Sequence, residues 1–311
     1  MMRSIVLAAG IAAFGAVGAI ASPLTDKYSS FFVFGDSLSD NGNLFRAIGL
    51  PPDPYLDGRF SDGPVWNEGI LQDFTAAGEV SANFAFGGAT AVANGDPVPD
   101  LSLQLGSFGA SVPKAALGDR PLASLWFGAN DILDAIEDFA NGLKVDSEVL
   151  AAAAAAADAV GAGVRALDLS GITDFAVWNL PDIGLTPRYQ LFEPGSATLA
   201  SEASKAFNAQ LDIVLAGLKD DGLQVTKIDT AGLFAEVLAD PGAFDLKNLT
   251  TPCALLGGVP CDDFLYFDDI HPTTVAHAVL ADTFVAAVPL PASGVLLAFG
   301  LGLLALRRRA A

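Results

Sequence analysis

Residues 31–42 read FFVFGDSLSDNG. The first five form an apolar run without polar alternation, which is typical of a strand covered on both faces in a parallel sheet. Gly35, Asp36 and Ser37 then lead into a turn, so Ser37 is expected at the carboxyl edge of the sheet, where open α/β folds bind ligands. For Asp36 the pattern favours a turn or capping role over direct chemistry.

Four other short apolar runs indicate strands, and helix-length segments separate them. The expected strands cover residues 80–86, 123–128, 174–180 and 223–229. The expected helices cover residues 64–77, 100–110, 147–168, 197–220 and 273–287. This alternation predicts an α/β layered fold with right-handed crossovers. No repeat and no proline- or serine-rich linker divides residues 22–287, so a single domain is predicted there.

The composition excludes several classes of protein. The chain has 311 residues, 36 of them acidic and 16 basic, which gives a formal charge of −20. Because no basic surface is available for phosphates, a nucleic acid partner is not expected. Two histidines and two cysteines argue against most structural zinc sites, and the sequence holds no HExxH or EF-hand pattern. Neither a metal nor a cofactor is expected.

The N-terminal segment has the pattern of an export signal. Residues 1–21 begin with Arg3, continue through an apolar run and end with Ala-Ile-Ala, which is the order of a cleaved secretory signal. A membrane anchor is the alternative, but the run is short and rich in glycine and alanine.

Residues 288–311 form a tripartite tail. The sequence VPLPA at 288–292 begins an uncharged stretch of 19 residues that ends at Leu306, and three arginines follow. Such a span approaches the ~20 residues that cross a bilayer, with the arginines on the cytoplasmic side. The tail resembles a PEP-CTERM sorting signal of the VPLPA variant. That resemblance implies a Gram-negative host, transient membrane contact and removal of the tail by an exosortase-type enzyme. The protein is then released from the cell or displayed on its surface by way of the periplasm; a permanent anchor is the alternative.

The part between the two end segments is strongly acidic and contains both cysteines. The ends together hold four arginines and no acidic residue, so residues 22–287 carry a net charge of −24. Export implies an oxidising compartment, which favours a disulfide between Cys253 and Cys261 over two free thiols. The bridge would stiffen the loop that leads to residues 268–271.

A candidate base and acid lie near the C-terminal end of this part, where residues 266–273 read YFDDIHPT. A serine hydroxyl is a poor nucleophile unless a neighbouring base accepts its proton, and that base needs orientation. His271 is the candidate base and Asp268, three positions earlier, is the candidate acid that holds its other ring nitrogen. Asp269 competes for the same role, because spacing alone does not separate the two.

Two further segments end in groups suited to developing negative charge. Residues 83–90 read NFAFGGAT, and the backbone N–H groups of such glycines can approach a ligand closely. Residues 126–131 read WFGAND, in which the side-chain amide of Asn130 is a neutral donor for an oxyanion.

In combination these segments resemble the GDSL, or SGNH, family of esterases and lipases. Four blocks occur in the family's order, at residues 35–39, 87–89, 128–131 and 268–272. Two accompanying segments, residues 58–66 (GRFSDGPVW) and 179–187 (NLPDIGLTP), are also family-like, so that the resemblance spans about residues 30–285.

The resemblance implies a fold and a role for each matched residue. The fold is a three-layer α/β/α arrangement with a flavodoxin-like, five-stranded parallel sheet. Ser37 would be the nucleophile, His271 the general base and Asp268 its orienting acid. The oxyanion hole would comprise the backbone N–H groups of Ser37 and Gly88 and the amide of Asn130, with Gly87 as the alternative to its neighbour.

Several other residues are expected to be structural. His277, in the last expected helix, is interpreted as a surface or packing residue. Trp66, Trp126 and Trp178 are interpreted as core. Arg59 fits an ion pair as well as a position in the cleft.

The favoured function is hydrolysis of a carboxylic ester, whether a lipid, short-chain or carbohydrate ester, by an exported enzyme. The sequence leaves acyltransferase chemistry open within this class. The alternative function is a surface or matrix protein built on an inactive hydrolase scaffold, which the sorting tail suggests.

Overall fold

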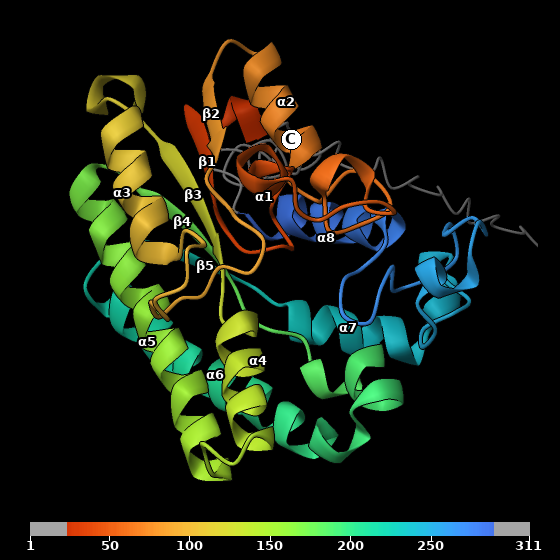
Figure 1. Cartoon of the computed structure of the whole chain (residues 1–311). Coiled ribbons are helices and arrows are strands. Elements are labelled where there is room, and N and C mark those ends of the chain that lie inside the picture. Colours follow the sequence, from red (N-terminus) through yellow and green to blue (C-terminus); the bar gives the residue numbers. More distant parts are fainter. Residues whose placement is uncertain (1–23, 289–311) are drawn as a thin grey trace, which may run out of the picture.

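The computed structural model describes residues 24–288, and it contains the predicted parallel sheet (Figure 1). The strands lie in the order β2-β1-β3-β4-β5, all parallel. They are β1 (Ser30–Gly35), β2 (Val80–Asn83), β3 (Pro121–Trp126), β4 (Asp174–Trp178) and β5 (Gln224–Ile228). This order reverses direction between β1 and β3, and such a switch point in an open α/β sheet places a ligand crevice at the carboxyl ends of the strands.

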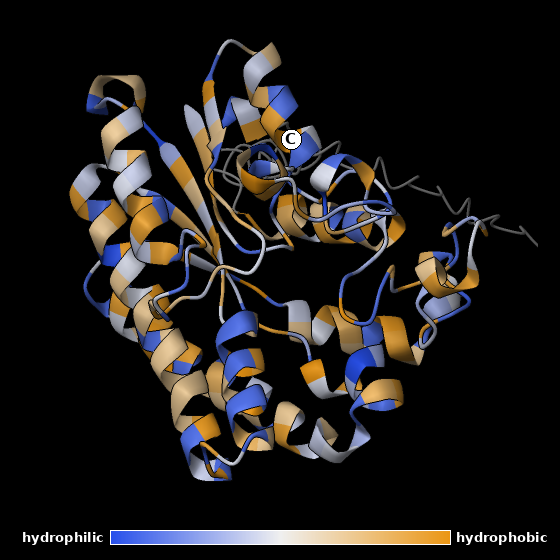
Figure 2. Cartoon of the chain, in the orientation of Figure 1, coloured by the Kyte–Doolittle hydropathy of each residue, from blue (hydrophilic) through white to orange (hydrophobic). Residues whose placement is uncertain are grey.

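Helices cover both faces of the sheet, which gives the expected three layers (Figure 1). One face carries α2 (Glu68–Ala76) and α8 (Thr274–Ala287); the other carries α3 (Leu101–Ser111), α5 (Asp146–Ser170) and α6 (Ala197–Asp220). Hydrophobic and hydrophilic residues alternate along the second group of helices (Figure 2), as expected for helices with one buried side.

Three helices at the carboxyl edge of the sheet were not predicted. They are α1 (Asn43–Ile48), α4 (Ala129–Ala140) and α7 (Thr230–Ala239). The first is very short, and the last is apolar over most of its length, so neither shows a clear helical period. α4 does have a signal, because its buried residues Ile132, Ala135 and Ile136 follow helical spacing directly after the Gly-Ala-Asn-Asp block.

Short single-turn helices complete the described chain. They are η1 (Leu24–Asp26), η2 (Leu56–Gly58), η3 (Lys114–Ala116), η4 (Ile183–Leu185), η5 (Arg188–Phe192), η6 (Pro194–Ser196), η7 (Pro241–Phe244) and η8 (Cys253–Leu256). Strand β2 is shorter than the expected 80–86, but the chain beyond it stays beside β1, where Phe84 and Phe86 donate backbone hydrogen bonds to Val33 and Gly35.

The interior strand β1 is buried on both faces, which explains its unbroken apolar run. Phe31 points to the α2 and α8 layer, where its ring centroid lies 5.6 Å from that of Phe74 and 5.6 Å from that of Phe284. Phe32 and Phe34 point to the other layer and contact Phe108 at 5.0 and 5.6 Å.

The three tryptophans lie in the core, as predicted. Trp126 and Trp178 stack at 4.3 Å between ring centroids, and Trp66 lies 4.6 Å from Trp178. All three side chains are buried.

Cys253 and Cys261 form the predicted disulfide within an irregular segment before α8. The backbone N–H groups of Cys253 and Ala254 donate to the carbonyls of Tyr266 and Phe267. The bridged loop therefore braces the backbone immediately before Asp268.

The predicted export signal, residues 1–21, and the predicted tail beyond Val288 lie outside the described residues. Their boundaries at 22 and 287 stay predictions.

Candidate active site

The turn after β1 is held on several sides. The side chain of Gln104 donates to the carbonyl of Gly35 at 2.8 Å and accepts from its N–H at 3.0 Å. The carboxylate of Asp40 accepts from the backbone N–H groups of Gly42, Leu44 and Gly87, so it joins the turn to α1 and to the glycine segment. No pattern in the sequence had predicted this role of Asp40.

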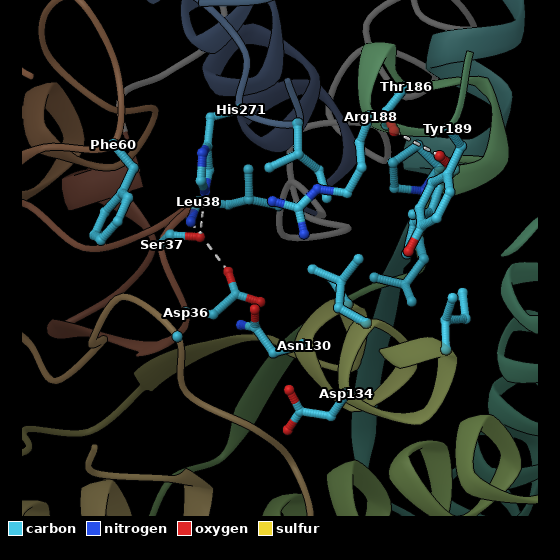
Figure 3. Close-up of a pocket in the computed structure, with 18 of the residues that line it drawn as sticks. Asp36, Ser37, Leu38, Phe60, Asn130, Asp134, Thr186, Arg188, Tyr189 and His271 are labelled. Atoms are coloured by element: carbon cyan, nitrogen blue, oxygen red, sulfur yellow. Dashed lines mark hydrogen bonds between the residues drawn. The ribbon is translucent and has the colours of Figure 1, made fainter. Parts of the chain in front are cut away.

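The structure brings Ser37, His271 and Asp268 into one hydrogen-bonded chain, and Figure 3 shows the part of it between Ser37 and His271. Ser37 Oγ lies 2.8 Å from His271 Nε2, and His271 Nδ1 lies 2.7 Å from Asp268 Oδ2. An ionised carboxylate only accepts hydrogen bonds, so His271 Nδ1 carries the donated proton and Nε2 is left to accept one from Ser37.

Asp268 and His271 stabilise each other's charged forms. Burial by itself would raise the pKa of Asp268, but the charge and ring N–H of His271 and two backbone N–H groups hold the pKa well below its usual range. Burial would lower the pKa of His271, and the charge of Asp268 and its hydrogen bond more than offset this, so the pKa lies above its ordinary value.

The competing carboxylate, Asp269, faces away from this chain. Its Oδ2 accepts from Arg188 Nε at 2.8 Å, and its backbone carbonyl accepts from the N–H of Arg188 at 2.7 Å. The structure therefore places Asp268, and not Asp269, on His271.

The hydrogen bonds of the glycine segment distinguish Gly87 from Gly88 as the candidate oxyanion donor. The N–H of Gly87 is occupied, because it donates to Asp40 Oδ2 at 2.8 Å. The N–H groups of Gly88 and Ser37 have no hydrogen-bond acceptor among residues 24–288. Gly88 has a φ of +85°, a conformation that few other residues adopt, and it lines the same cavity as Ser37.

Asn130, the second residue of α4, completes the set of donors around the cavity. Its Nδ2 donates one hydrogen to the carbonyl of Ala89 at 2.9 Å, which fixes the amide and leaves its second hydrogen for a ligand. Asp131 accepts from the backbone N–H groups of Ala91 and Val92, and this holds the chain after the glycines against α4.

A cavity of about 570 Å³ opens beside Ser37. Figure 3 shows Ser37 and His271 on one side of it and Arg188 and Tyr189 on the other. One part of its wall is apolar, and the charged residues Asp134, Glu137, Arg188 and Glu193 also line the cavity. The apolar part is formed by Leu133, Ile136, Ala140, Leu180, Ile183 and Phe234. A volume of this size accepts a small-molecule ligand and not only a solvent molecule.

Two further buried titratable groups lie beside the hydrogen-bonded side chains of Ser37, His271 and Asp268. Asp36 is 1% exposed and its Oδ2 has no hydrogen-bond partner, so burial raises the pKa of this carboxyl to about 7. His277 on α8 is also buried without a partner for either nitrogen, and burial lowers its pKa to about 3. His277 is therefore a neutral packing residue, in line with the sequence interpretation.

Arg59 proves to be structural. Its Nε and Nη2 each donate to the carboxylate of Glu68 at 2.7 Å, at the start of α2. Phe60, its neighbour, lies against the site instead, with its ring centroid 5.1 Å from that of His271.

The structure thus combines a parallel five-stranded sheet between two helix layers with a cluster of polar residues at the carboxyl edge of that sheet. The chain belongs to the GDSL-like lipase/acylhydrolase family, whose model matches residues 31–284. It is accordingly a carboxylic-ester hydrolase.

Two relatives illustrate the match. A phosphatidylcholine-sterol acyltransferase of Aeromonas hydrophila is 28% identical over 82% of this chain and 88% of that protein. A thermolabile hemolysin of Vibrio parahaemolyticus is 26% identical over 83% of this chain, which spans 63% of the longer relative. Among solved structures, a lipase from a goat rumen metagenome is 15% identical, with a TM-score of 0.49, over 83% of this chain and 96% of that one.

Proposed function

We propose that this chain is an exported serine esterase that cleaves carboxylic esters through an acyl-enzyme intermediate on Ser37. The observation that carries the proposal is the hydrogen-bonded chain from Ser37 through His271 to Asp268 at the mouth of a cavity. An inactive scaffold is the less favoured function, because each group that acyl transfer needs is in place.

The reaction proceeds in two acyl-transfer steps. Ser37 Oγ attacks the ester carbonyl while His271 Nε2 takes its proton, and the imidazolium then gives that proton to the leaving alcohol. Water then attacks the acyl carbonyl while His271 Nε2 takes one of its protons. The bond between the acyl carbon and Ser37 Oγ breaks, the imidazolium returns the proton to Ser37 Oγ, and the acid is released. Asp268 holds the ring of His271 and stabilises its charged form throughout.

Three donors receive the charge that develops on the carbonyl oxygen. They are the unoccupied N–H groups of Ser37 and Gly88 and the second amide hydrogen of Asn130. Removal of one such donor typically costs about 2.7–4 kcal/mol of transition-state stabilisation. Of the three donors, only the amide of Asn130 belongs to a side chain, so it is the one that a substitution removes without altering the backbone.

The cavity favours an acyl chain longer than acetyl, and thus a lipid ester over a short-chain or carbohydrate ester. Its apolar wall continues from Asn130 along α4 through Leu133 and Ile136. Burial of apolar chain against such a wall contributes about 0.8 kcal/mol per methylene group.

A panel of p-nitrophenyl esters with acyl chains from acetate to palmitate tests the proposal. Ser37→Ala should abolish hydrolysis at every chain length. Ser39→Ala is the matched control, because it removes a buried hydroxyl of the same turn that bonds Trp66 and not His271. Unchanged turnover in Ser37→Ala would remove Ser37 from its role, and an inactive wild-type protein would favour the scaffold.

We further propose that residues 1–21 direct export and that an exosortase-type enzyme removes the tail beyond residue 287. The sequence of both ends and the disulfide, which suits an oxidising compartment, support this. Mass spectrometry of protein from its native host should then detect no peptide from residues 300–309. Recovery of that peptide from mature protein would instead favour a permanent anchor.

A further inference from the structure

A tyrosine outside the matched family blocks contacts the acid beside His271. Tyr55 lies in the proline-rich loop between α1 and α2, and its hydroxyl donates to Asp268 Oδ2 at 2.7 Å. This is the same oxygen that accepts from His271 Nδ1. One carboxylate oxygen is therefore shared between the base and a phenol from a segment 213 residues away.

The other oxygen of the Asp268 carboxylate, Oδ1, also accepts two hydrogen bonds. Asp268 Oδ1 accepts from the backbone N–H groups of Ile270 at 2.9 Å and His271 at 2.6 Å. These two bonds fix one oxygen, and Tyr55 is the only donor besides the imidazole that the described residues offer to the other. The orientation of the Asp268 carboxylate about its Cβ–Cγ bond thus depends in part on the hydrogen bond from Tyr55.

The fold builds this contact from several sides. The ring of Tyr55 meets Phe267 edge-on at 5.2 Å between centroids and lies 5.9 Å from Phe60. Farther along the same loop, Ser61 donates to the carbonyl of Pro272 at 2.9 Å, and Asp62 accepts from the N–H of Thr274 at 2.8 Å. Burial and the charge of Asp268 raise the pKa of Tyr55, so its hydroxyl remains a donor.

We propose that Tyr55 is a positioning residue that shares Asp268 Oδ2 with His271 and thereby sets how strongly the acid holds the imidazolium. The proposal rests on the proposed function for its catalytic consequence but not for its electrostatic one. A donor on Oδ2 draws negative charge away from the imidazole, so the charged imidazole is less stabilised with Tyr55 than without it.

The carboxyl and imidazole groups that act electrostatically on His271 lie on three segments of the described chain. Asp268 and Asp269 lie on its own loop, Asp36 lies beside it after β1, and neutral His277 lies behind it on α8. Because burial raises the pKa of Asp36 to about 7, the measurement is repeated in an Asp36→Asn background to remove its contribution.

The test replaces Tyr55 with phenylalanine, which keeps the ring contacts and removes only the hydroxyl. The acidic limb of the pH profile of kcat/KM should move upward by about half a unit to one unit. At the optimum, kcat/KM should fall by about tenfold, the value of one hydrogen bond to a charged group, with KM little changed. Tyr28→Phe is the matched control, because Tyr28 lies by Arg120 and Asp174, away from the site.

A direct titration separates this proposal from the proposed function. The chain has two histidines and His277 stays neutral, so proton NMR follows His271 without any substrate. An upward shift of the His271 pKa in Tyr55→Phe supports the proposal even if no ester is cleaved. An unmoved or lowered pKa, or a fall in kcat equal at every pH, would assign Tyr55 a purely structural role.

Discussion

At the scale of single residues, one carboxylate is distinguished from its neighbour by its partners. Asp268 receives two backbone N–H groups, a phenol and an imidazole, whereas Asp269 is held by Arg188. The two side chains are adjacent in sequence and identical in chemistry. This difference follows from the turn at residues 268–271. Because Asp268 Oδ1 accepts from the backbone N–H groups of Ile270 and His271, the turn holds the carboxylate of Asp268 against the ring of His271.

Substitution of these two acids by asparagine should separate them clearly. Asp268→Asn should lower kcat by about 10³–10⁴-fold, because the amide favours the wrong imidazole tautomer and leaves the imidazolium unpaired. Asp269→Asn should cost less than about tenfold, since it weakens a half-exposed ion pair. Steady-state kinetics on one ester measures both, and the reverse order would reassign the acid.

At the scale of elements, α4 joins the proposed oxyanion site to the cavity. Asn130 lies in its first turn, and Leu133, Ile136 and Ala140 follow on the cavity side at helical spacing. One rigid helix therefore places a donor near Ser37 and an apolar wall beyond it, so the length of chain that fits depends on the side chains along α4.

Leu133→Trp should shorten the preferred acyl chain, because Leu133 is half-buried at the cavity wall and a larger ring fills the space beyond Asn130. Hydrolysis of acetate and butyrate esters should persist, while kcat/KM for dodecanoate should fall by about tenfold or more, the value of roughly two buried methylene groups. Leu169→Trp, at an exposed position of α5, is the control. An unchanged chain-length profile in Leu133→Trp would place the acyl chain elsewhere.

At the scale of the whole molecule, the fold raises the pKa of one acid to near neutrality within a strongly acidic chain. Burial raises the pKa of Asp36 to about 7 from 3.8, so the folded state favours the protonated form. The stability that this group contributes is present below pH ~4 and is lost as the pH rises through about 7.

Asp36→Asn should therefore be more stable than the wild type at pH 8, by on the order of a few kcal/mol, and this advantage should be clearly smaller at pH 5, which lies nearer the unfolded pKa of 3.8. Asparagine keeps an oxygen for the N–H of Leu38, which Asp36 Oδ1 accepts at 3.0 Å. Urea unfolding at the two pH values measures the difference. Asp119→Asn, at an exposed position, should show none, and a variant that is less stable at pH 8 would contradict the buried-acid interpretation.

The amino-acid sequence by itself determined the sheet, its five main helices, the disulfide and the segments that carry Ser37, Gly88, Asn130 and His271. Most of these features depend on local patterns, namely apolar runs, helical spacing and glycine-rich strand ends. The disulfide was predicted because both cysteines lie in the part of the chain that is expected to be exported. The edge helices α1 and α7 escaped prediction because their period is weak, whereas α4 has a helical pattern from which it could have been predicted.

Only the tertiary structure decided which acid meets His271, which glycine N–H is unoccupied, how the cavity is shaped and that Tyr55 reaches Asp268. Each of these depends on contacts between segments far apart in the chain, such as Asp40 with Gly87 or Tyr55 with Asp268. Hydrogen bonds act over about 3 Å, and neighbouring residues of the same type become different only when the fold brings a particular partner within that distance.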